Sequence, residues 1–138
     1  MCLRRRFKGV KDFSVNAGAK ELILDLEERC CIRQLTLHIG MNSSTGTYQT
    51  RVIIKIDEDE ILNKNLSEIY VMFSAYKTSA DSNRPVQTLL YDNTNKNYAY
   101  IFLDLGRVER RFALFIENKD TSNPAIVHAG VVYDILED

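Results

Sequence analysis

The sequence predicts an all-β fold, a jelly-roll-like antiparallel β-sandwich of about eight or nine short strands. Segments in which apolar residues alternate with other residues recur along the chain of 138 residues, and this period of two is typical of half-buried strands. Turn-forming residues separate the segments at intervals of about 8–12 residues, as in sandwiches and barrels. Helical patterns do not alternate with the strands, which disfavours a parallel α/β sheet.

The clearest pattern covers residues 22–39. Leucines alternate with other residues at 22–26, a charged break follows at 27–29, and apolar residues alternate again at 35–39. Two half-buried strands joined by a short polar break are typical of a β-hairpin. We therefore expect this segment to form a pair of strands onto which the rest of the sandwich packs.

The segment 98–105 is apolar on both of its alternating faces. We expect Ile101, Leu103 and Leu105 to face the core, and the aromatic side chains between them to face outward, where a neighbouring subunit could cover them. The other segments predicted to be strands are residues 13–15, 48–56, 86–91, 112–116 and 126–136.

Residues 62–76 fit two patterns. Their apolar side chains recur at helical spacing, but they also alternate between residues 69 and 75. The enrichment of β-branched and aromatic residues over 69–76 favours a strand there. We predict a short turn or helical piece over residues 62–67, followed by a strand.

The charge distribution divides the chain into a basic N-terminal arm, residues 1–11, and a single sandwich domain, residues 12–138. The formal net charge is only -1. No overall field therefore attracts nucleic acid or an anionic membrane, and contact with nucleic acid is expected only through the arm. No segment approaches the roughly 20 consecutive apolar residues that span a membrane.

The chain lacks the residue patterns of catalysis. Cys2, Cys30 and Cys31 make a poor disulfide framework, because their number is odd and two are adjacent, so we expect reduced cysteines and a reducing cytoplasm. His38 and His128 each stand alone in a strand pattern, and the chain has neither a nucleophile elbow nor a phosphate-binding glycine loop. The sequence therefore predicts a protein that is not an enzyme and needs no cofactor.

An acidic run at residues 57–60 is the candidate for cation binding. Carboxylate oxygens are the ligands that calcium prefers, so Asp57 and Asp59 are the calcium candidates. The run has no EF-hand pattern. A charged turn that solvates the end of a strand is the favoured interpretation.

The order of several motifs resembles the galactose-binding-domain-like (discoidin-type) jelly rolls. Asp25-Leu26 precedes IRQLTLH at residues 32–38, YQTRVIIKIDED follows at 48–59, and a late strand pair covers 111–117 and 126–135. The resemblance implies a jelly-roll sandwich that binds a carbohydrate or another ligand through loops at one end. The loops MNSSTGT, KTSADSNR and NKDTSNP contain no aromatic residue on which a sugar ring could stack, so we keep this function as the alternative.

A small sandwich with a basic arm and polar loops also resembles viral and phage accessory structural proteins, such as capsid decoration, head or tail subunits. That resemblance implies a non-enzymatic structural or assembly protein, made in the cytoplasm and assembled into a virion. Its partners would be protein subunits, either further copies or other virion proteins. The residues predicted to make these contacts are Arg4, Arg5, Arg6, Tyr98, Tyr100 and Phe102.

Overall fold

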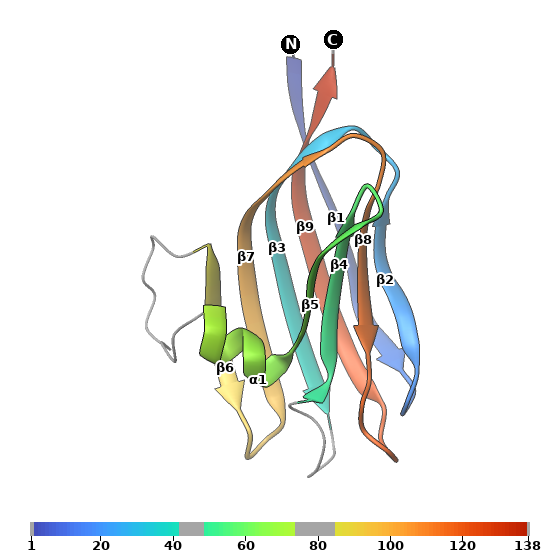
Figure 1. The fold of residues 1–138 in the computed structure, drawn as a ribbon, viewed down its shortest axis with the longest axis vertical. Coiled ribbons are helices and arrows are strands. Elements are labelled where there is room, and N and C mark those ends of the chain that lie inside the picture. The colour runs from blue at the N-terminus through green and yellow to red at the C-terminus, as the bar shows by residue number, and fades with distance from the viewer. Residues whose placement is uncertain (1, 42–48, 74–84, 138) are drawn as a thin grey trace.

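The computed structural model describes residues 2–41, 49–73 and 85–137 and confirms the all-β sandwich. A five-stranded antiparallel sheet in the order β1-β9-β3-β7-β6 packs against a four-stranded sheet in the order β2-β8-β4-β5 (Figure 1). The strands expected at 86–91, 112–116 and 126–136 are confirmed, each slightly longer than predicted. The strands of the described residues are β1 (Cys2–Val15), β2 (Lys20–Leu26), β3 (Cys30–Met41), β4 (Arg51–Ile56), β5 (Asp59–Asn65), β6 (Val86–Asp92), β7 (Asn97–Val108), β8 (Phe112–Glu117) and β9 (Ala125–Glu137).

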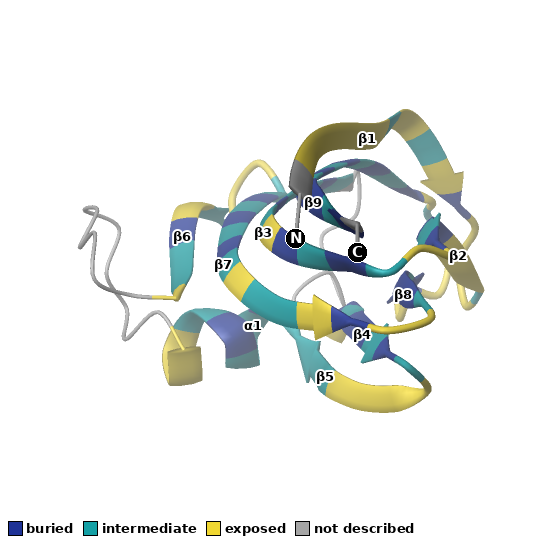
Figure 2. Cartoon of the chain, turned by 90° about the horizontal axis from the view of Figure 1, so that it is seen from above, coloured by how far each residue is buried: buried dark blue, intermediate teal, exposed yellow. Residues whose placement is uncertain are grey.

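Both sheets send alternate side chains into one shared core. Leu35, Leu37 and Ile39 of β3 belong to the same buried cluster as Val52 and Ile54 of β4. Burying one such side chain contributes roughly 1.5–3 kcal/mol, so this cluster is the main source of stability. Exposed residues concentrate on outer strands such as β1 and β5, whereas buried positions line the strands between them (Figure 2).

The predicted hairpin at residues 22–39 is wrong in its pairing. Its two strands, β2 and β3, lie in different sheets: β2 pairs with β8, whereas β3 lies between β7 and β9. Alternation shows that one face of a strand is buried, but it does not identify the strand's partner. Both strands cover the same core from opposite sides, and residues 27–29 carry the chain from one sheet to the other.

The expectation that aromatic residues of β7 face outward is also wrong. Tyr98, Tyr100 and Phe102 are at most 2% exposed, whereas Ile101 and Leu103 are half-buried on the outer face. Both faces of this segment are apolar, so alternation could not choose between them. The larger side chains fill the core, where the Tyr100 hydroxyl donates a hydrogen bond to the Leu66 carbonyl at 2.7 Å.

The predicted basic arm is part of the sheet. Residues 2–15 form β1, which pairs with β9 from Cys2 opposite Glu137 to Val15 opposite Ala125, so the two ends of the chain lie together (Figure 1). The boundary predicted at residue 11 therefore falls inside a strand, close to a bulge between Val10 and Phe13. An edge strand tolerates charged side chains because water reaches them, and this hid the strand pattern of the segment.

Residues 62–76 adopt the two structures in the reverse of the predicted order. The strand comes first, ending at Asn65, and a helical turn α1 (Leu66–Glu68) follows, continued by a π-helical turn η2 (Ile69–Phe73). The Asn65 side chain accepts a hydrogen bond from the Glu68 amide, and the Glu68 carboxylate accepts one from the Asn65 amide. This capping box starts the helix. Residues 74–76 lie outside the described residues.

The contact between β7 and α1 can be tested with Tyr100→Phe. This substitution removes the hydrogen bond to the Leu66 carbonyl, which keeps one donor, the Ile69 amide. We expect the free energy of unfolding to fall by about 1 kcal/mol, measured by urea denaturation followed by circular dichroism. The matched control is Ile61→Ala on β5, which is 47% exposed and should change stability by less than about 0.5 kcal/mol. Equal effects from the two variants would contradict the assigned hydrogen bond.

Candidate functional site

The three predicted contact residues in the N-terminal segment are all exposed, and one of them, Arg5, also forms an ion pair within the sheet. Arg4 and Arg6 are exposed on β1. Arg5 binds Asp134 of β9 through two hydrogen bonds, from Nε to Oδ1 at 2.9 Å and from Nη2 to Oδ2 at 3.2 Å. Arg33 of β3 donates to the same carboxylate at 2.6 Å. The Asp134 carboxylate thus ties three neighbouring strands of the five-stranded sheet together.

Hydrogen bonds from Arg5 and Arg33 lower the pKa of Asp134 to about 2. The Asp134 side chain is only 7% exposed, so these two guanidinium groups replace much of the water that would otherwise solvate its charge. The Asp134 carboxylate is therefore an internal group of the sheet, whereas the Arg5 and Arg33 side chains that bind it are 57% and 41% exposed.

The calcium candidate Asp57 has a role within the fold. Its carboxylate accepts hydrogen bonds from the backbone amides of Glu109, Arg110 and Arg111, at 2.9, 2.7 and 2.9 Å. These hydrogen bonds lower the pKa of Asp57, and the bond from the Arg111 amide has the largest effect. Asp59 is exposed at the start of β5. Within residues 2–41, 49–73 and 85–137, no group of three His, Cys, Asp or Glu side chains is arranged to hold a metal ion.

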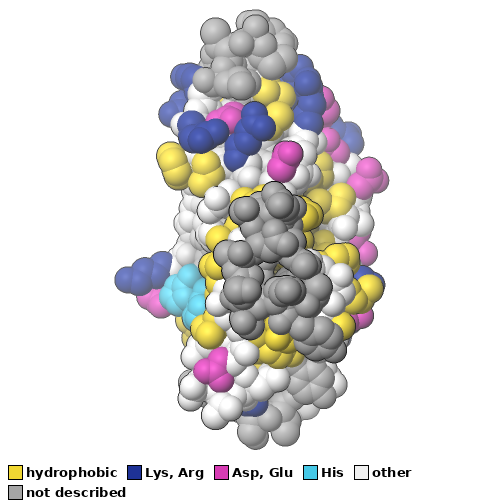
Figure 3. Space-filling model, turned by 90° about the vertical axis from the view of Figure 1, so that its left-hand side faces the viewer, with side chains coloured by type: hydrophobic (Ala, Val, Ile, Leu, Met, Phe, Trp, Pro, Cys, Tyr) yellow, Lys and Arg dark blue, Asp and Glu magenta, His cyan; other side chains and the backbone are white. Residues whose placement is uncertain are grey.

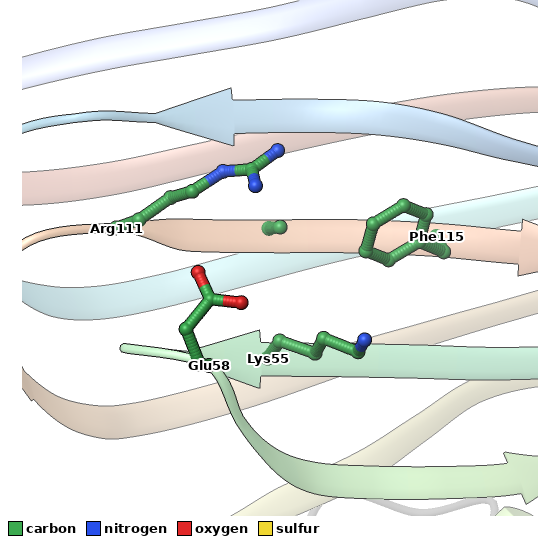
Figure 4. Close-up of a pocket in the computed structure, with 5 residues that line it drawn as sticks. Lys55, Glu58, Arg111 and Phe115 are labelled. Atoms are coloured by element: carbon green, nitrogen blue, oxygen red, sulfur yellow. The ribbon is translucent and has the colours of Figure 1, made fainter.

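A small cavity lies on the outer face of the four-stranded sheet (Figure 4). Its volume is about 50 Å³, and Lys55, Glu58, Arg111 and Phe115 line it together with Ala113. The Lys55 side chain extends toward the ring of Phe115, and its Nζ lies 5.7 Å from the ring centroid. A cavity of this size holds a few water molecules but no substrate.

Two histidines meet on the outer face of the five-stranded sheet. His38 and His128 are direct partners in the ladder between β3 and β9, and their ring centroids are 5.5 Å apart. Nδ1 of His128 accepts a hydrogen bond from the Asp12 amide at 3.1 Å. Burial lowers the pKa of His38, and the nearby His128 lowers it further by a smaller amount. The sequence could not show this pair, because only the strand register brings the two residues together.

The largest group of exposed apolar side chains lies at the β6 edge of the five-stranded sheet. The described residues include eight exposed large hydrophobic side chains, and five of them belong to β6 and the adjacent η2. Their exposed fractions range from 38% to 57%. The rings of Tyr70 in η2 and Tyr91 in β6 stack with their centroids 4.2 Å apart, and this contact joins the two elements. We call this set the β6 patch: Val71, Met72, Phe73, Leu89 and Leu90.

Charge separates the two edges of the five-stranded sheet. The β1 edge carries Arg4, Arg5, Arg6 and Lys8, whereas β6 has no lysine or arginine and only Asp92 at its end. On the β6 side, hydrophobic side chains gather around the middle of the molecule, and Lys and Arg gather near the end where the termini lie (Figure 3). Natural proteins place charges on exposed edge strands to prevent unwanted pairing. Among the described strands of this sheet, β1 carries such charges and β6 does not.

The chain matches no protein-family model and no curated protein, so its function is inferred from the arrangement of its own residues. No helix among the described residues has the length and apolar character needed to cross a membrane. The signal for the β6 patch was present in the sequence, since residues 85–91 contain no charge. It could not be interpreted before the structure placed this segment at the edge of a sheet.

The Arg5–Asp134–Arg33 cluster predicts a dependence of stability on pH. The pKa of Asp134 is about 2 in the folded chain, against an ordinary value of 3.8. The unfolded chain therefore binds the proton more tightly. The carboxylate stabilises the fold fully above pH 3.8, and this contribution is lost as the pH falls through about 2.

Asp134→Asn should therefore lower the urea midpoint at pH 7, and its difference from the native chain should shrink as the pH approaches 2. Urea denaturation across this pH range measures the effect. Asp59→Asn, which removes an exposed carboxylate, is the matched control and should leave the midpoint unchanged. A difference for Asp134→Asn that stays constant with pH would contradict the proposed role of the charge.

Proposed function

We propose that this chain is a non-enzymatic structural or assembly protein that acts through protein–protein contacts at the β6 patch. The observation that carries the proposal is that five of the eight exposed large hydrophobic side chains among the described residues belong to β6 and the adjacent η2. Exposed apolar side chains that gather in one region of a soluble protein mark candidate interaction sites. A virion accessory subunit, made in the cytoplasm, is one protein of this class.

The β6 patch replaces the contact surface expected from the sequence. Tyr98, Tyr100 and Phe102 belong to the core, so they are not available to a partner. Arg5 is engaged with Asp134, while Arg4 and Arg6 lie on the charged edge at the other side of the sheet. The exposed basic residues are suited to the polar surroundings of an interface, and the apolar patch to its centre.

The size of a stable interface sets a further requirement. A standard interface buries about 800 Å² on each partner, which five partly exposed side chains cannot supply alone. Neighbouring residues must contribute a polar rim.

One described loop argues against the alternative, a ligand-binding module that uses loops at one end. In the loop at residues 118–124, the Asn118 side chain donates hydrogen bonds to the carbonyls of Val15 and Asn123. Asp120 accepts hydrogen bonds from the amides of Ser122 and Asn123. Asn118 and Asp120 are both buried. These polar groups hold the loop's own conformation instead of facing a ligand.

The proposed function is tested by photo-cross-linking in the native source. A photoreactive phenylalanine analogue replaces Met72 in the β6 patch, and the same analogue replaces Ile61 on β5 as a control of similar exposure. We expect position 72 to cross-link to one recurring protein subunit, identified by mass spectrometry, because the patch is covered in the assembled state. Cross-linking at neither position, or equally at both, would contradict an interface at the patch.

A further inference from the structure

Phe7 is the most exposed large hydrophobic side chain among the described residues, with an exposed fraction of 76%. It lies on β1, at the border of the sheet opposite to β6, and its partner in β9 is Val132. Side chains two residues apart share one face of a strand, so Arg5 and Phe7 lie on the same outer face of the five-stranded sheet. This face therefore presents an aromatic ring next to a basic group.

Arg33 of β3 is the second basic group of this face. Arg33 and Arg5 both donate from Nε to the Asp134 carboxylate, at 2.6 and 2.9 Å, and both side chains remain exposed. Within the described part of the chain Arg33 bonds through Nε alone, so its two Nη groups can donate to an anion. The shared carboxylate orients both guanidinium groups, which reduces the entropy lost when they bind.

The strand β1 concentrates positive charge along the border of this face. Five of its exposed side chains are basic, and one, Asp12, is acidic. At physiological ionic strength charges are screened beyond about 8 Å. The local excess of positive charge therefore matters more to a bound anion than the net charge of -1. The basic residues are Arg4, Arg5, Arg6, Lys8 and Lys11.

A groove runs along the outer face from Phe7 to the histidine pair. It consists of two hollows of about 360 and 340 Å³ that meet at Gly130. Phe7 lines the first hollow and His128 the second. Gly9 and Gly130 are direct partners between β1 and β9, so neither strand raises a side chain at this point. The groove therefore continues between its two aromatic ends.

His128 provides the second ring surface of the groove. Its side chain is 37% exposed, and the hydrogen bond from the Asp12 amide to Nδ1 fixes the orientation of the ring. In Figure 3 the histidine side chains lie at the surface of the molecule. Val132 and His128 are four residues apart on β9, which separates the two ends of the groove by about 13 Å. Nucleic acid bases stack on phenylalanine and histidine rings of this kind.

We propose that the outer face of the five-stranded sheet binds a single-stranded nucleic acid. Arg5 and Arg33 donate to phosphate oxygens, and Phe7 and His128 stack bases along the groove. Proteins that bind single strands combine a basic path for the backbone with aromatic stacking surfaces. A duplex keeps its bases stacked on one another, so the two rings favour a single strand. This site goes beyond the proposed function, because it lies on β1, β3 and β9 rather than at the β6 patch.

Fluorescence anisotropy with the full chain tests the stacking surface. The probes are fluorescein-labelled oligouridylate and oligothymidylate, which distinguish RNA from DNA as the source of the single strand. Phe7→Ala should weaken binding on the order of 10-fold, because it removes a ring on which a base stacks. The matched control is Ile61→Ala on β5 in the other sheet, which is 47% exposed and should leave the affinity unchanged.

The salt dependence of binding tests the phosphate contacts. For single strands, the logarithm of the binding constant falls with the logarithm of salt concentration by about 0.7 for each phosphate contacted. Arg33→Gln should therefore reduce this slope by about 0.7. Lys64→Gln removes a positive charge from β5 and should leave the slope unchanged. Circular dichroism checks that each variant is folded, and the exposed Phe7 keeps the test decisive if Arg33→Gln is unstable.

The outcomes separate this inference from the proposed function. A native chain that binds neither oligonucleotide overturns it, as does binding that Phe7→Ala leaves intact. A preference for a duplex over the single strands also overturns it. Cross-linking from position 72 reports on the β6 patch alone, so the proposed function stands or fails separately.

Discussion

One sheet has five strands and the other has four, and this difference in width determines where apolar side chains remain exposed. Five strands face four, so the inner faces of β6 and β7 extend beyond the strand β5 at the border of the opposite sheet. The helical turns α1 and η2 lie beside this part of the sheet (Figure 2). Leu66 and Ile69 enter the core, and the Tyr70 ring stacks on Tyr91. The same turns leave the apolar side chains at the end of η2 exposed. The turns that cover the core at this side therefore supply Val71, Met72 and Phe73 of the β6 patch.

The sequence predicted the fold class because alternation depends only on which face of a strand is buried. The prediction failed where alternation identifies neither the partner of a strand nor the face that is buried. The strands β2 and β3 alternate clearly, yet they lie in different sheets, because both sheets share one core. In β7 both faces are apolar, and only packing showed that Tyr98 and Tyr100 belong inside. In β1, arginines on an exposed edge concealed a strand.

The candidate site was harder to predict than the fold because its parts are distant in sequence. The β6 patch combines residues 71–73 with residues 89 and 90, and the His38–His128 pair depends on a strand register that no local pattern encodes. The absence of charge over residues 85–91 was visible from the start. Its meaning depends on comparison with the other edge of the same sheet, which only the topology identifies.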